Sequence, residues 1–143
     1  GILGISRDIS KKKLLEKELL LLNTAINKTT NNIVITNYEG SIEYVNEGFI
    51  KKLGYSHDEL IGGSPELINS GHHSEAFFKN LWDTIKQGKV WEGEIYNKTK
   101  NNTYFWELAT ITPIIDETGT ISHFLKVATD ITTFKQYEMS VIH

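Results

Sequence analysis

The stretch at residues 88–106 constrains the fold most, because it contains a complete strand, a polar hairpin and the start of a second strand. Side chains alternate along a strand, so counting by twos groups the residues of one face. One face of the first strand then holds Trp91, Gly93, Ile95 and Asn97. An apolar face that ends in an amide suits a sheet curled around a small pocket.

Composition excludes several kinds of site. The chain has no cysteine, which removes disulfides, thiolate metal sites and cysteine-based chemistry. Its net charge of -3 and its single arginine, Arg7, argue against nucleic-acid binding, which needs a basic surface. The glycines at Gly62 and Gly63 lack the spacing and lysine of a phosphate loop. With no nucleophile paired with a base, the sequence predicts a binding module that is not an enzyme.

The apolar runs are short. The longest, at residues 19–22, is far below the length that crosses a bilayer, and no secretory leader is visible. We therefore expect a cytoplasmic domain with no membrane contact in this segment.

The two ends of the chain carry a similar motif. Asp8-Ile9-Ser10 and Asp130-Ile131-Thr132 each stand between a short apolar segment and a Lys-containing, helix-like segment, about one domain length apart. Residues 1–9 are therefore predicted to be the last strand of a preceding repeat of the same kind, in a tandem array. With one partial repeat, a chance likeness stays open.

Residues 10–30 are predicted to form an amphipathic helix. Ser10 is a plausible N-cap. The apolar residues at 4-3-4 spacing are Leu15, Leu19, Leu22 and Ile26. Two heptads are fewer than a clear coiled coil requires. Two interpretations remain: the helix lies on its own domain, or it forms a homodimer seam with a second chain.

The rest of the chain alternates turn signals with short periodic runs. Strands are predicted at residues 33–36 and 42–45, and a short helix after Asn46 that Gly54 closes. Ser56 and Glu59 have the spacing of a capping box. A third helix is predicted from Ser74, with an apolar face formed by Phe78, Leu81, Trp82 and Ile85.

Two further strands follow the hairpin, one from Tyr104 towards Ile115 and one over residues 120–129, joined by a turn at residues 116–119. The order is two strands, short helices, then three strands with tight connections. This order predicts an α+β domain in which helices gather on one side of an antiparallel sheet.

Several motifs, in this order and spacing, resemble the PAS domain family of sensory modules. They are residues 37–46, residues 53–62, Trp91-Glu92-Gly93-Glu94, Thr112-Pro113-Ile114 and Asp130-Ile131-Thr132. The resemblance implies a PAS domain at residues 31–132 and a signalling helix that starts within residues 133–143. It also implies a five-stranded antiparallel sheet whose concave face encloses a small-molecule cavity, with flanking helices that carry signals and often dimerise.

Some ligands of the family are excluded or disfavoured. The light-sensing flavin branch uses a cysteine adduct, which this chain cannot form, and Ala128 stands where that branch has a glutamine. Haem binders place an iron ligand in the helix that corresponds to residues 74–87, where no histidine occurs. His72 and His73 precede that helix and are expected to be exposed loop residues. Adjacent histidines without a third ligand make a poor metal site.

The redox-sensing flavin branch, which includes nitrogen-fixation regulators and aerotaxis receptors, is more similar. This resemblance implies that Trp82, Trp91 and Asn97 surround flavin adenine dinucleotide (FAD). A flavin packs on indole rings, and its pyrimidine edge needs an amide that donates and accepts. The alternative is that both tryptophans fill the core and that Asn97 caps the hairpin. Lys126 is either a solvated lysine or a cation at the cavity rim.

The predicted function is therefore a sensor and signal-relay module of a multidomain protein. It would sense a small ligand or redox state and pass the change to its flanking helices. The alternative is a ligand-free PAS spacer used for dimerisation within a tandem array. Neighbouring PAS and effector domains are the expected partners, and a histidine kinase or a cyclic-dinucleotide enzyme would fit as the effector.

Overall fold

The computed structural model describes residues 2–28 and 30–142. Its centre is a five-stranded antiparallel sheet with the strand order β2-β1-β5-β4-β3. The strands are β1 (Asn32–Asn37), β2 (Ile42–Val45), β3 (Trp91–Lys98), β4 (Tyr104–Ile115) and β5 (Ile121–Asp130). The helices are α1 (Ile2–Lys28), α2 (Glu47–Leu53), α3 (His57–Leu60), the 3₁₀ helix η1 (Pro65–Ile68), α4 (Glu75–Lys86) and α5 (Thr132–Ile142). The predicted α+β fold is confirmed.

Local signals explain where the short helices begin and end. Gly54 ends α2 with a φ of 81°, a left-handed conformation that glycine adopts without a Cβ clash. Ser56 and Glu59 form the predicted capping box at the start of α3. The Ser74 hydroxyl accepts from the backbone N–H of Phe77 and starts α4.

Asn46 precedes α2 as predicted, but its side chain does not cap the helix. Its Oδ1 accepts from the Ile33 N–H at 2.9 Å, and its Nδ2 donates to the Asn31 carbonyl at 2.9 Å. Asn46 is fully buried, so both halves of its amide are satisfied by the backbone beside β1. It ties the start of α2 to the sheet.

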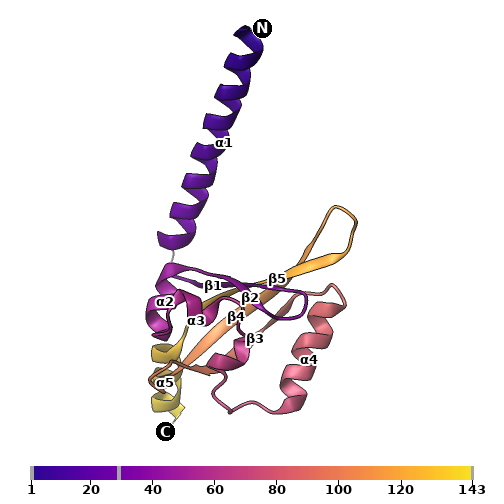
Figure 1. The fold of residues 1–143 in the computed structure, drawn as a ribbon. Helices are drawn as coiled ribbons and strands as arrows, with labels where there is room; N and C mark the ends of the chain where they lie inside the picture. Colours follow the sequence, from indigo (N-terminus) through magenta and orange to yellow (C-terminus); the bar gives the residue numbers. More distant parts are fainter. Residues whose placement is uncertain (1, 29, 143) are drawn as a thin grey trace.

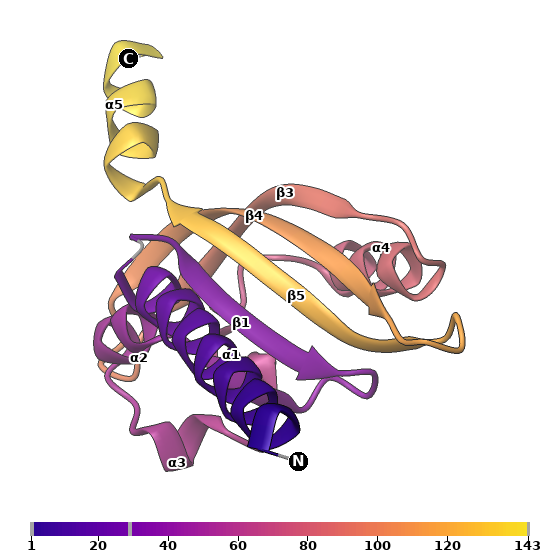
Figure 2. The same cartoon turned by 90° about the horizontal axis from the view of Figure 1, so that it is seen from above.

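The short helices α2 and α3, together with α4, lie on one side of the curved sheet, and α5 leaves from the end of β5 (Figures 1 and 2). The core forms two separate apolar clusters on that side. One, centred on Phe49 and Leu53, joins β1 and β2 to α2, α3 and η1. The other, centred on Ile85 and Phe124, joins α4 to β3, β4 and β5.

The N-terminal helix is longer than predicted. It begins at Ile2, so residues 2–9 are helical and the strand predicted there is wrong; Gly1 lies outside the described residues. Whether a similar repeat precedes the chain stays a prediction. Helix α1 projects away from the sheet (Figure 1), and its leucines remain 56–65% exposed: Leu14, Leu15, Leu19, Leu20, Leu21 and Leu22. These side chains do not lie on their own domain.

Candidate ligand-binding cavity

A cavity of about 540 Å³ lies between the two apolar clusters, on the inner side of the sheet. Its volume falls within the range of small-molecule sites, and its walls are mostly apolar. The exposed lining residues are Ser64 at the N-cap of η1, Glu66 and Leu67 of η1, and Glu75 and Lys79 of α4. The cavity therefore opens to solvent between these two helices.

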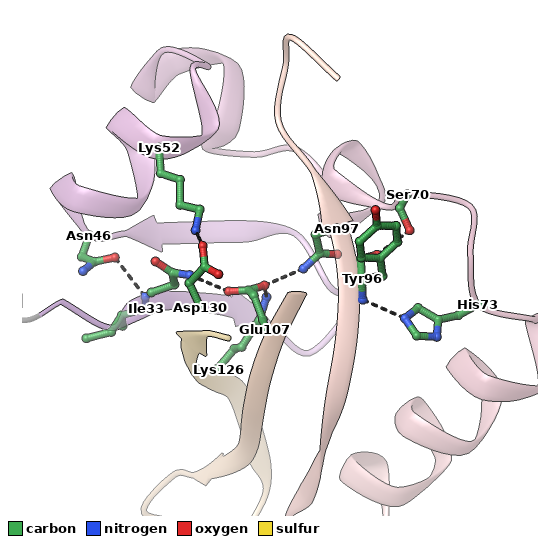
Figure 3. Close-up of polar contacts among 11 residues, drawn as sticks. Ile33, Asn46, Lys52, Ser70, His73, Tyr96, Asn97, Glu107, Lys126 and Asp130 are labelled. Atoms are coloured by element: carbon green, nitrogen blue, oxygen red, sulfur yellow. Dashed lines mark hydrogen bonds and ion pairs between the residues drawn. The ribbon is translucent and has the colours of Figure 1, made fainter. Parts of the chain in front are cut away.

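The polar side chains that the sheet presents to the cavity are those of Thr36, Asn97 and Lys126. Behind Asn97 and Lys126 lies Glu107 of β4, whose side chain is 0% exposed. Its Oε1 accepts from Asn97 Nδ2 at 2.5 Å and from Lys126 Nζ at 2.7 Å, and its Oε2 accepts from Asn32 Nδ2 at 2.7 Å (Figure 3). Four strands thus contribute to one buried hydrogen-bond network.

The network offsets the cost of burying charge. A carboxylate removed from water is costly unless paired and hydrogen-bonded, and Glu107 has one cation and two amides around it. Lys126 is 14% exposed in its side chain, and its ammonium also lies 5.5 Å from the centre of the Phe49 ring. This end of the cavity therefore carries a neutralised ion pair, and an incoming ligand meets a lysine whose charge is already matched.

The three predicted cofactor residues lie in different surroundings. Asn97 lines the cavity, as the alternation along β3 predicted, and is 4% exposed. Its Nδ2 donates one of its two hydrogens to Glu107, so its Oδ1 and the second Nδ2 hydrogen remain for a ligand. Trp82 also lines the cavity and meets Phe124 edge to face, with ring centres 5.8 Å apart.

Trp91 is not among the residues that line this cavity. Its ring folds back over Gly93, where an added Cβ would lie 2.7 Å from the indole. Its other neighbour is Phe77 of α4, with ring centres 5.6 Å apart and nearly perpendicular planes. Trp91 thus packs between its own strand and α4, while its part in ligand binding stays a prediction.

The histidine pair divides into two environments. His72 is exposed, as predicted, and lies against Tyr96 and Trp106 on the outer side of β3 and β4. His73 is half-buried instead, and its Nε2 accepts from the Tyr96 backbone N–H at 2.8 Å (Figure 3). Burial, and secondarily the nearby His72, lowers the pKa of His73 below its usual value near 6.5.

Lys126 and Glu107 differ in how far the sequence predicted their positions in this site. The sequence leaves Lys126 as either a solvated lysine or a cation at the cavity rim; in the structure its ammonium contacts Glu107 and its side chain is 14% exposed. Glu107 was not anticipated, although it occupies an inward position between Phe105 and Ala109. A charged residue among inward apolar positions is the signal that would have found it.

The opposite side of β4 connects the site to α5. Trp106, next to Glu107, donates its N–H to Thr132 Oγ1 at 2.9 Å and accepts from the Ile131 N–H at 2.9 Å. Asp130 Oδ1 accepts from the Thr132 N–H at 2.8 Å, and its other oxygen pairs with Lys52 of α2 (Figure 3). The motif Asp130-Ile131-Thr132 therefore joins β4, α2 and the first turn of α5.

Within residues 2–28 and 30–142, no group of three or more histidines and carboxylates could hold a metal ion. No helix in these ranges has the length and apolarity needed to cross a membrane.

Comparison with known proteins gives one family. The PAS domain family profile matches residues 30–133. Two similar curated proteins are a nitrogen fixation regulatory protein of Klebsiella pneumoniae, 26% identical over 111 residues, and the aerotaxis receptor of Escherichia coli K12, 29% identical over 110 residues. These alignments cover 78% and 77% of this chain, but only 22% of each relative.

Solved structures agree on the fold. The PAS domain of a protein from Colwellia psychrerythraea matches with a TM-score of 0.71 at 26% identity, covering 80% of this chain and 98% of that one. An RNA-binding Light-Oxygen-Voltage receptor matches with a TM-score of 0.72 at 18% identity, covering 78% of this chain and 33% of that one. At that identity the second match speaks to the fold alone.

Proposed function

The chain belongs to the PAS domain family, and on that premise we propose that it is a sensory and signal-relay module that binds a small molecule in its cavity. The observation that carries the proposal is the cavity itself, an apolar chamber with Asn97 and Lys126 at one end. The family match supports a regulatory role, and Asn97 and Lys126 are suited to recognise a ligand in the cavity.

FAD is the ligand that we propose, in line with the resemblance to the redox-sensing flavin branch. Trp82 would face the flavin ring, and Asn97 Oδ1 and the Lys126 ammonium would contact its polar edge. The chain's own groups fit, since a mostly apolar cavity presents an amide that can accept and donate, from Asn97, and a lysine that can donate, from Lys126. When bound, a flavin supplies reversible electron transfer, so the protein itself needs no activated catalytic group.

The proposed relay runs across β4. Glu107 faces the inside through Asn97 and Lys126, while its neighbour Trp106 bonds through both backbone groups to the start of α5. A ligand that changes the Glu107 network would alter the position of β4 against α5. Such coupling requires two arrangements that differ in ligand affinity.

The absorption spectrum of the purified protein tests the flavin. We expect the yellow colour of oxidised flavin, either as purified or after adding FAD, and a loss of bound flavin in Asn97→Ala and Trp82→Ala. Asn101→Ala, in the exposed hairpin, is the matched control. A colourless protein that takes up no FAD would contradict the flavin proposal.

A second function, a ligand-free dimerisation spacer, is favoured by the exposed leucines of α1. We propose that these leucines pair with α1 of a second copy, whether or not the cavity binds a ligand. Analytical ultracentrifugation tests this: Leu15→Asp with Leu22→Asp should give monomers, and Lys13→Ala with Lys17→Ala should not. A dimer that binds no small molecule would select the spacer over the sensor.

The chain spans about a fifth of the curated relatives it matches, so the wider protein is also a matter of proposal. We propose that residues 31–132 act as the sensor within a cytoplasmic multidomain protein, with α1 and α5 as its connections to a preceding PAS repeat and to an effector. Expressing the full-length protein and measuring the effector's activity with and without flavin would test this layout.

A further inference from the structure

The segment at residues 62–74, here called the strap, runs from the edge strand β2 to the other edge strand β3 on the cavity side of the sheet. It joins α3 to α4 and contains η1. Part of it lines the cavity: Ser64, Pro65, Glu66, Leu67, Ile68 and Asn69. Because the cavity opens between η1 and α4, the position of the strap sets the width of the opening.

At the β2 edge the strap is held by the backbone alone. The Ile42 N–H donates to the Gly63 carbonyl at 2.8 Å, and the Gly62 N–H donates to the Ile42 carbonyl at 2.7 Å. Neither bond involves a group that titrates near neutral pH. This end of the strap is a fixed anchor.

At the β3 edge the strap is held partly by side chains. Asn69 forms an isolated β-bridge with Asn97, Ser70 Oγ donates to the Tyr96 carbonyl at 2.5 Å, and Tyr96 N–H donates to His73 Nε2 at 2.8 Å. The free backbone groups of Tyr96 on the sheet edge are therefore both satisfied by strap side chains (Figure 3). One of these three contacts depends on a histidine.

His73 can accept from Tyr96 only while Nε2 carries no proton, since both nitrogens of a histidinium are donors. Its ring stacks on Phe77 of α4 with ring centres 4.0 Å apart and planes 14° apart. The surroundings favour the neutral ring as well, because burial and His72 lower the pKa of His73. Protonation would set two N–H donors against each other at the sheet edge.

No charged or titratable group named on the surrounding elements takes the place of His73 as acceptor for the Tyr96 N–H. His72 of the strap and Tyr96 of β3 are the near titratable groups, and Phe77 and Phe78 are the α4 residues that contact the ring. Glu75 lies in the first turn of α4. Glu94 of β3 pairs with Lys135 of α5 at 2.8 Å, beside Trp106. The carboxylate of Glu94 is therefore engaged.

We propose that the strap is a pH-sensitive cover of the cavity, in which protonation of His73 releases the β3 end and widens the opening between η1 and α4. The backbone anchor at β2 stays in place, so the strap swings rather than unfolds. The cover acts on access to the cavity and is independent of which ligand binds there.

Amide hydrogen exchange gives the direct test. The protection of the Tyr96 N–H, corrected for the intrinsic pH dependence of exchange, should be constant above pH 7. It should fall by up to about tenfold per pH unit as the pH drops below the ordinary histidine value of about 6.5, and level off once the pH passes the lowered pKa of His73 in the closed strap or the open strap predominates. Protection that stays constant down to pH 5 would overturn the proposal.

Cavity access gives the second test, because the natural chain has no cysteine. A single cysteine at Ile111→Cys, in the cavity wall, is labelled with a small maleimide, and its rate is divided by that of Glu117→Cys in the exposed β4–β5 turn. The ratio removes the pH dependence of thiol reactivity. It should rise several-fold from pH 7.5 to pH 5.5.

Two histidine substitutions, each combined with the cysteine variants, test whether His73 causes the rise of the labelling ratio at low pH. His73→Gln keeps an acceptor that does not titrate, so the labelling ratio should become independent of pH. His72→Gln, the matched control, should keep the rise. An equal rise in both variants, or none in the natural sequence, would overturn the proposal. Because no ligand is used, either result leaves the sensor proposal to be judged by its own experiment.

Discussion

The two ends of the cavity are built differently. The sheet end is a closed network in which Glu107 receives bonds from residues on three other strands, Asn32, Asn97 and Lys126. At the strap end, Ser70 and His73 each form one hydrogen bond to Tyr96 of the edge strand β3. A buried network loses much when one member is removed, whereas an edge contact can open locally at small cost. The Glu107 network is therefore suited to recognise a ligand, and the strap is suited to open and let a ligand enter the cavity.

Removing Glu107 should have the largest effect. Glu107→Ala leaves Lys126 buried without its anion and should lower the free energy of unfolding by about 3–5 kcal/mol, measured by urea denaturation. Glu117→Ala, on the exposed turn, should change it by less than about 0.5 kcal/mol. The double variant Glu107→Leu with Lys126→Met should recover much of the loss. A small effect of Glu107→Ala would erase the contrast between the two ends.

Asn97→Ala should come second. It removes one donor from the buried carboxylate and should cost about 1–3 kcal/mol in urea denaturation, because the remaining partners cannot fill the vacated position. Asn101→Ala in the hairpin serves as the control. Equal stability of the two variants would show that Asn97 is held only for its contact with ligand.

Ser70→Ala probes the strap end and should cost less. The loss of one side-chain bond to the Tyr96 carbonyl should lower stability by about 1 kcal/mol. Amide exchange near Tyr96 should accelerate, while β4 amides such as that of Thr110 keep their protection. Uniform acceleration across the sheet would mean that the strap does not open by itself.

The pH dependence of stability should be the smallest effect. Because the pKa of His73 is lowered in the folded state, its contribution is complete above about pH 6.5 and is lost as the pH falls from there through the folded-state pKa. Thermal unfolding should show a decrease in Tm from pH 7.5 to 5.5 that His73→Gln removes. The Ser56 N–H lowers the pKa of Glu59, and the Thr118 hydroxyl lowers the pKa of Asp116. These two carboxylates therefore change the pH dependence of stability only below about pH 4.5.

The sequence by itself determined most of the fold. Local chemistry placed the cap at Ser74, the capping box at Ser56 and the stop at Gly54, because each acts through its own neighbours. Alternation placed Asn97 on the inner face of β3, since a strand has a fixed period of two. The strand predicted at residues 1–9 is wrong because a three-residue motif does not specify a strand, and residues 2–9 continue α1.

Tertiary structure decided what these positions meet. In the strand register Lys126 lies opposite Ile111, and Glu107 opposite Asp130, so no pairing rule joins the lysine to the glutamate. Their long side chains meet along the concave face of the curved sheet. The indole of Trp91 similarly bends over Gly93, a contact that depends on side-chain rotation and not on strand period. The period of a strand assigns each side chain to one face of the sheet, whereas the curvature of the sheet and the path of the strap decide which partner it meets.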